Sequence, residues 1–117
     1  MSDTDALAAL SALAHEHRLW VFRLLVRHSP EGLAAGDIAA HMQLPPSSLS
    51  FHLASLERAG LIASRRVQRH IIYTANLGGM RGLLSFLTED CCDGHPEVCA
   101  ELISPRQRRK AGQGPGL

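Results

Sequence analysis

The residues best suited to chemistry are three cysteines near the C-terminal end of the chain: Cys91, Cys92 and Cys99. They are all the cysteines that the chain has, and an odd number of thiols cannot pair off within one protomer. In a reducing compartment such a cluster indicates free thiols or a metal site rather than a disulfide framework. Gly94 and Pro96 lie between the second and third thiols, where they can fold the chain back on itself.

The spacing of these thiols limits the ions that they can bind. Adjacent residues at the end of a helix point about 100° apart, so Cys91 and Cys92, with Cys99 folded back, predict a pyramid of three sulfur atoms. Soft thiolates prefer thiophilic ions, and a pyramid suits As(III) or Sb(III), whose lone pair takes the fourth direction. Zn(II) prefers four tetrahedral ligands, and His95 would complete a Cys3His set. A site for Zn(II), Cd(II) or Pb(II), a thiol redox switch, and a tail without a sensing role stay open as alternatives.

Charge is distributed unevenly, although the formal net charge is only +1. Residues 45–70 contain four arginines and one acid, Glu57, whereas residues 89–101 contain five acids and no lysine or arginine. The basic segment suits phosphate, and the acidic segment suits a cation or solvent. The chain has no Cys-x-x-Cys, no anion-cradling glycine loop and no paired nucleophile and base, so we do not expect an enzyme.

Two amphipathic helices are predicted in the first thirty residues. Asp3 and Thr4 are candidate N-caps of the first helix. Its apolar positions recur at helical spacing: Leu7, Leu10 and Leu13. A second helix from about Glu16 carries its own apolar stripe: Leu19, Phe22, Leu25 and Val26.

The next segments are typical of a helix-turn-helix followed by a β-hairpin. A short helix within residues 33–42 is interrupted at 43–45, and a new helix begins with Pro46 at its first position and stops at Gly60. Residues 61–65 and 70–74 are rich in β-branched side chains and flank a basic loop, which predicts a hairpin, here called the wing. A last helix from about Leu77 carries a further apolar stripe: Met80, Leu83, Leu84 and Leu87. The predicted fold is mainly α with a β-hairpin wing, a winged helix-turn-helix.

This order of elements is one that places a helix in the major groove of DNA. Small polar side chains near the start of the helix that begins at Pro46 let its backbone approach the groove closely. The candidate contacts on this helix are Ser47, Ser48, Ser50 and His52. Arginines at the tip of the wing are expected to contact phosphates or the minor groove. They are Arg65, Arg66 and Arg69.

Residues 49–62, Leu-Ser-Phe-His-Leu-Ala-Ser-Leu-Glu-Arg-Ala-Gly-Leu-Ile, resemble the recognition-helix signature of the ArsR/SmtB family of repressors. The resemblance extends from about residue 6 to 87. It implies a homodimer whose first and last helices form the interface, and a palindromic double-stranded operator. The apolar stripes of these two helices fit such an interface and an ordinary core equally well. The chain departs from the family pattern at Pro45, where a polar N-cap is usual, and at Gln68, where the wing commonly has glycine.

The resemblance also bears on the inducer. The family's Cys-x-Cys arsenic site would fall in residues 34–42, which contain no cysteine, and its zinc site would need histidine in residues 77–89, which contain none. The tail resembles that of an arsenic-responsive subgroup with a Cys-Cys pair and a third cysteine. This likeness implies As(III) as the inducer, Sb(III) as a possible substitute, Cys91, Cys92 and Cys99 as the ligands, and no constitutive cofactor.

We expect one DNA-binding and dimerisation domain over residues 1–103, with a cysteine sensor segment at 89–99 and a disordered basic tail at 104–117. The acidic N-terminus lacks the features of a secretory signal, and no apolar run approaches the length of a membrane span. The protein is therefore expected in the cytoplasm.

Overall fold

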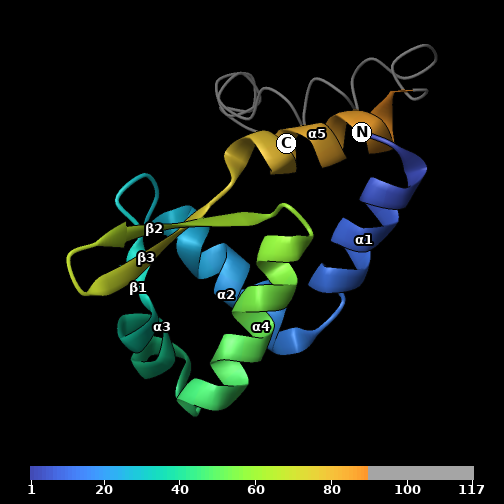
Figure 1. Ribbon diagram of the computed structural model, residues 1–117. Coiled ribbons are helices and arrows are strands. Elements are labelled where there is room, and N and C mark those ends of the chain that lie inside the picture. Colours follow the sequence, from blue (N-terminus) through green and yellow to red (C-terminus); the bar gives the residue numbers. More distant parts are fainter. Residues whose placement is uncertain (90–117) are drawn as a thin grey trace, which may run out of the picture. The chain divides into compact units, whose positions relative to one another are not determined.

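The computed structural model describes residues 1–89, and the expected mainly α fold with a wing is confirmed there (Figure 1). The chain falls into two compact units, Met1–Arg81 and a second that begins at Gly82. The described elements are α1 Asp3–Leu13, α2 Glu16–Arg27, β1 Leu33–Ala34, α3 Ala35–Met42, α4 Pro46–Arg58, β2 Ile62–Val67, β3 His70–Ala75 and α5 Leu77–Thr88. Within residues 1–89, no helix is both long enough and apolar enough to cross a bilayer.

Helix α1 begins one residue earlier than its predicted caps allow. Ser2 is the N-cap: its side chain accepts a hydrogen bond from the backbone N–H of Asp5, whose carboxylate accepts from the backbone N–H of Ser2. This reciprocal pair is a capping box, which requires a spacing of three residues. The prediction of Asp3 or Thr4 as the cap was therefore wrong, because both already lie beyond the capping position.

The buried face of α1 is made of alanines, not of leucines. Ala6, Ala9 and Ala12 are buried, whereas Leu7 is 66% exposed and Leu10 is 39% exposed. Small side chains let α1 pack closely against its neighbours within the first unit. Leu7 and Leu10 therefore contribute little to the core of the protomer.

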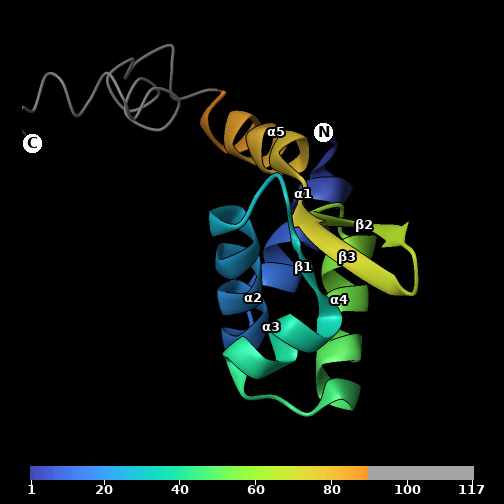
Figure 2. The same cartoon turned by 90° about the vertical axis from the view of Figure 1, so that its left-hand side faces the viewer.

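The core of the first unit lies between α2, α3 and α4 and the start of the wing (Figure 2). Its largest fully buried side chains are Val21, Leu25, Ile38, Leu49, Leu53, Leu56 and Leu61. Burial of each leucine or isoleucine stabilises the fold by about 1.5–3 kcal/mol relative to an exposed position. These contacts fix the buried face of α4 to the core.

The turn between α3 and α4 is built as the sequence predicts. Gln43 closes α3 in the left-handed conformation, with φ of 56°. Pro45 is extended, with φ of −62° and ψ of 144°, and Pro46 begins α4 at its first turn. Since proline lacks an N–H and has its φ preset, this start is favourable even without a side-chain cap.

The three strands form one antiparallel sheet in the order β1-β3-β2. In the wing Val67 pairs with His70, which leaves Gln68 and Arg69 as a two-residue turn, and Gln68 has φ of 57° where glycine would be easier. Strand β1 was not predicted, because two residues are too few to show a period. Just before β1 begins, the backbone passes close to β3 at Gly32. This residue has φ of 85°, and a Cβ there would lie 2.5 Å from the carbonyl oxygen of Tyr73.

Candidate nucleic-acid interface

Helix α4 has one buried side and one exposed side. Leu49, Leu53 and Leu56 are each at most 2% exposed and fix the helix to the core. Ser47, Ser48 and Ser50 are exposed, as expected for residues that are to meet another surface. Together with Phe51 these serines form what is here called the recognition face.

Phe51 was missed as a candidate contact. Its side chain is 63% exposed although it is large and apolar. The signal in the sequence is its spacing, because it follows Leu49 by two positions and precedes Leu53 by two, which places it off the leucine stripe. An apolar side chain on a groove-reading helix can contact the methyl group of thymine.

His52 is separated from the serines by its burial. It is only 7% exposed and lies against His15 and His17, at ring-centroid distances of 4.6 and 5.6 Å. Burial lowers the pKa of His52, and the nearby charges of His15, Arg18 and His17 lower it further. His52 is therefore not available on the surface of α4 for the groove contact that was expected of it.

The three wing arginines are exposed but do not share one position. Arg65 and Arg66 lie within β2, where they pair with Ile72 and Ile71, and Arg69 is in the turn. Only Arg69 is at the tip, contrary to the expectation for all three. The Nη2 of Arg65 donates a hydrogen bond to the carbonyl oxygen of Glu31, at 2.9 Å. Because successive strand residues point to opposite faces, Arg65 and Arg66 cannot both face the same phosphates.

The acid within this basic segment connects the wing to α4. Ser64 in β2 donates a hydrogen bond from Oγ to Oε2 of Glu57, at 2.8 Å. Burial raises the pKa of Tyr73, and the charge of Glu57 adds to this shift. Glu57 thus helps to hold the first residues of β2 against the end of α4.

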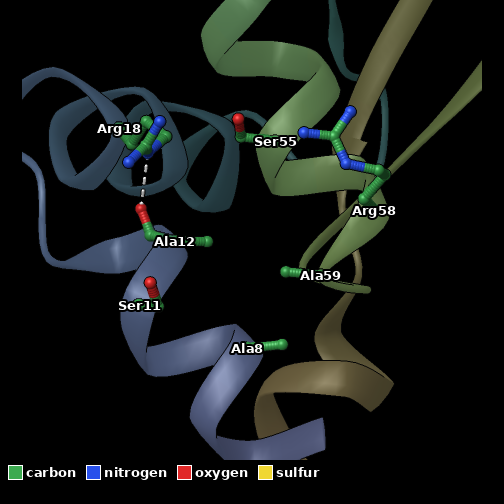
Figure 3. A pocket seen from close by; sticks show the side chains of 7 residues that line it. All are labelled: Ala8, Ser11, Ala12, Arg18, Ser55, Arg58 and Ala59. Carbon is green, nitrogen blue, oxygen red and sulfur yellow. Dashed lines mark hydrogen bonds between the residues drawn. The ribbon is translucent and has the colours of Figure 1, made fainter.

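A cavity of about 280 Å³ opens where α1, α2 and α4 meet, and it was not foreseen from the sequence (Figure 3). Its lining residues are Ala8, Ser11, Ala12, Arg18, Ser55, Arg58 and Ala59. The Nε of Arg18 donates a hydrogen bond to the carbonyl oxygen of Ala12, at 2.8 Å, which joins α2 to the end of α1. Two guanidinium groups and two serine hydroxyls thus share this hollow with alanine side chains.

The predicted thiol ligands Cys91, Cys92 and Cys99 lie outside the described residues. So do the basic tail and His95, the alternative fourth ligand for Zn(II). Helix α5 ends at Thr88, three residues before the first of these thiols.

Known proteins are similar to this chain in sequence and in fold. The sequence model of a protein family described as a helix-turn-helix domain matches residues 13–65. The HTH-type transcriptional regulator YgaV of Escherichia coli is 32% identical over 91 residues, which cover 78% of this chain and 90% of that protein. The transcriptional activator HlyU of Vibrio cholerae is 29% identical over 94 residues, 80% of this chain and 84% of that protein.

Solved structures agree with this relationship. An ArsR-like transcriptional regulator from Rhodococcus has the same fold, with a TM-score of 0.70, 22% identity, and coverage of 86% of this chain and 93% of that one. A homodimeric winged helix-turn-helix domain from Mycobacterium bovis, described as possibly of the ArsR family, matches with a TM-score of 0.61, 24% identity, and coverage of 84% and 93%.

A third solved structure, described as a possible transcriptional regulator for arsenical resistance, has a TM-score of 0.59 and 26% identity, with coverage of 80% and 94%. The proteins named among these relatives are regulators of transcription. Sequence identity, fold and the exposed face of α4 agree, and the chain belongs to the family of helix-turn-helix transcriptional regulators that includes YgaV, with the winged helix-turn-helix fold of the solved structures.

Proposed function

We propose that this regulator is a homodimeric repressor that binds a palindromic operator and releases it when As(III), or Sb(III), binds Cys91, Cys92 and Cys99. The observation that carries the proposal is the position of the thiols, three residues beyond the end of α5 at Thr88 in a chain whose α4 presents an exposed polar face. Each part of the proposal rests on separate support.

Operator binding is supported by the recognition face and the wing. The major groove of B-DNA accepts an α-helix, and the short serine side chains leave room for α4 to approach the base edges. Phe51 adds an apolar surface for a thymine methyl group. Arg66 and Arg69 supply charge for phosphates, which contributes affinity but little sequence information. Two copies of α4 would read half-sites about 34 Å apart, or a multiple of that distance.

Dimerisation is supported by the exposed leucines of α1. Leu7 and Leu10 point away from the alanine face that packs within the protomer. On α5, Leu83 is buried whereas Leu87 is 50% exposed. Exposed apolar side chains on helices are candidates for a subunit interface, and the Mycobacterium bovis neighbour is described as homodimeric.

Arsenite is favoured as the inducer by the number and type of donors. Arsenous acid condenses with three thiols to give one neutral tris-thiolate and three molecules of water, so charge and atoms balance without any oxidant. The acidic residues beside the cysteines disfavour thiolates but do not oppose this reaction of thiols. A structural relative described in connection with arsenical resistance is consistent with this choice.

Coupling between the two sites follows from free-energy balance. An inducer that binds the DNA-free dimer more tightly than the DNA-bound dimer by ~1.4 kcal/mol weakens operator binding tenfold. The thiols follow α5 closely in the sequence, so an ion bound by them can act on α5. The alternatives are a repressor of the same fold that responds to Zn(II), Cd(II) or Pb(II), or to oxidation of the thiols.

Fluorescence anisotropy with an operator fragment, selected from random duplex DNA by the protein itself, tests the proposal. The reduced wild type and a C91S/C92S/C99S variant are titrated with As(III), Sb(III) and Zn(II), and with a thiol oxidant in a separate arm. We expect both proteins to bind the fragment equally, and only the wild type to release it with As(III) or Sb(III). Equal release by the variant excludes the thiol site. Release by Zn(II) or by the oxidant, but not by As(III), identifies one of the alternatives.

A further inference from the structure

Three histidines from distant parts of the sequence meet within the first unit. They are His15, His17 and His52, here called the histidine cluster, and one ring nitrogen of each lies within 4.8 Å of the others. His15 is the extended N-cap of α2, and its Nδ1 accepts a hydrogen bond from the backbone N–H of His17, at 3.2 Å. That bond uses the lone pair of Nδ1, which places the proton of the neutral ring on Nε2, so binding of a metal by His15 requires that this bond be released.

His52 is the buried member of the cluster. Its side chain is 7% exposed, and its Nδ1 is a buried polar atom without a hydrogen-bond partner. A buried polar atom without a partner costs about 1–3 kcal/mol, so most native side chains avoid this state. Among residues 1–89, no group supplies this ring nitrogen with a partner.

We infer that His15, His17 and His52 bind a divalent transition-metal ion of the Zn(II) class. Imidazole is a preferred ligand of such ions, and three histidines with an open fourth position form a known type of zinc coordination. In a tetrahedral site with Zn–N of about 2.0–2.1 Å, the nitrogens lie about 3.4 Å apart. Nitrogens now up to 4.8 Å apart must therefore approach by up to about 1.4 Å, and the exposed ring of His15 has room to rotate once its bond to His17 is released.

The charges around the cluster act in two directions. The lowered pKa of His52 keeps its imidazole neutral, which is the form that binds metal. Arg18, whose positive charge also acts on His52, opposes the approach of a cation. The hydrogen bond from Arg18 Nε to the carbonyl oxygen of Ala12 holds this side chain toward α1.

Such a site would join two elements with different roles. His15 and His17 belong to the beginning of α2, whereas His52 belongs to α4, one residue after Phe51 of the recognition face. A bound ion would cross-link α2 and α4 and fix the helix that is proposed to read DNA. This site uses none of the three thiols as ligands, and it does not depend on the proposed response to arsenite.

Binding of Co(II) to the full chain tests the inference, because its ligand-field absorption reports tetrahedral coordination and sulfur ligands add a charge-transfer band. The starting protein is the C91S/C92S/C99S variant, so that tail thiols cannot contribute. In this background H15N/H17Q removes two ligands, with asparagine chosen at position 15 because it can still cap α2. H28Q/H41Q is the matched control, since His28 and His41 form another ring pair, with centroids 5.9 Å apart.

We expect one Co(II) per chain without a charge-transfer band, displaced by Zn(II), and a rise in the thermal unfolding midpoint with either ion. H15N/H17Q should weaken binding by at least ~100-fold, because loss of even an outer-shell partner costs 10–100-fold. H28Q/H41Q should bind as the starting protein does. Absence of saturable binding in the starting protein, or equal binding by H15N/H17Q, overturns the inference. Release of DNA by As(III), measured with H15N/H17Q in the wild-type cysteine background, separately reports whether the thiol proposal holds.

Discussion

The side-chain amide of Asn76 donates a hydrogen bond from Nδ2 to the carbonyl oxygen of Gly60, at 2.9 Å. The Oδ1 of the same side chain accepts from the backbone N–H of Gly79, at 3.1 Å, which is the geometry of an N-cap for α5. The backbone N–H of Asn76 donates to the carbonyl oxygen of Leu61, at 2.8 Å. One residue thus connects the end of α4, the end of the wing and the start of α5.

Replacement of Asn76 should separate these two side-chain bonds. Asn76→Ala loses both, and we expect a loss of about 1–2 kcal/mol in the free energy of unfolding, mostly from the missing cap. Asn76→Asp keeps an acceptor for Gly79 but has no donor for Gly60, so its loss should be smaller. Urea denaturation followed by circular dichroism measures both changes. An Asp variant as unstable as the Ala variant would show that the bond to Gly60, not the cap, dominates.

Gly79 and Gly78 form a matched pair for a test of close packing. A Cβ on Gly79 would collide with the carbonyl oxygen of Gly60, whereas one on Gly78 would meet only Oδ1 of Asn76, at 3.5 Å. Gly79→Ala should therefore cost about 1–3 kcal/mol. Gly78→Ala should be neutral or stabilise by up to about 1 kcal/mol, because alanine favours a helix. Thermal unfolding of the two variants side by side measures the difference, and equal midpoints would contradict this packing.

The elements that local chemistry determines could be predicted, and the arrangement of distant residues could not. Pro46 and Gly60 mark the two ends of α4 by their own backbone preferences, so those limits are visible in the sequence. Strand β1 exists only because β3 lies beside it. Cysteine spacing predicted a thiol site, but the histidine cluster depends on α2 and α4 packing together.

The burial of His52 could nevertheless have been predicted from its spacing to the buried leucines of α4. It follows Leu49 by three positions and precedes Leu56 by four, which places it on the leucine stripe. Its polar type suggested the polar face, and the period of the helix proved the better guide. The exposed leucines of α1 show the reverse case, because periodicity identifies an apolar face without telling whether a core or a partner covers it.

Arg66 and Arg69 should determine the salt dependence of DNA binding. Each arginine that neutralises a phosphate contributes about 0.9 to the slope of log K against log salt concentration. R66A/R69A should therefore reduce that slope by about 1.8 while leaving the order of preference among operator sequences unchanged. Arg23→Ala is the control, because its guanidinium carbon lies 4.7 Å above the ring of Trp20 on α2. An unchanged slope in the wing variant would remove these arginines from the interface.

Leu10 and Leu19 allow a controlled test of the dimer interface, since each is 39% exposed. A lysine at position 10 would place a charge in the proposed interface, and we expect at least about a tenfold increase in the dimer dissociation constant, or ~1.4 kcal/mol. Leu19→Lys, on α2, should leave the constant unchanged. Sedimentation equilibrium over a range of protein concentrations measures both. Equal dissociation by the two variants, or none with Leu10→Lys, argues against α1 as the interface.

Acidification should destabilise the metal-free protein through His52. Burial, followed by the charges of His15, Arg18 and His17, lowers the pKa of His52 in the folded chain. As the pH falls below about 6.5, the ordinary value for histidine, the unfolded chain takes up a proton that the folded chain resists. The contribution of His52 to stability is therefore complete above that pH and declines from there toward the lowered, folded-state pKa.

Urea denaturation with a chelator, at pH values from about 7.5 to about 5 on either side of the ordinary histidine pKa, measures how the free energy of unfolding changes with pH. His52→Gln should flatten the slope in this window, whereas His70→Gln, at an exposed position of β3, should leave it as in the wild type. Parallel slopes for the wild type and His52→Gln would mean that other groups cause the acid sensitivity, because only His52 differs between the two proteins.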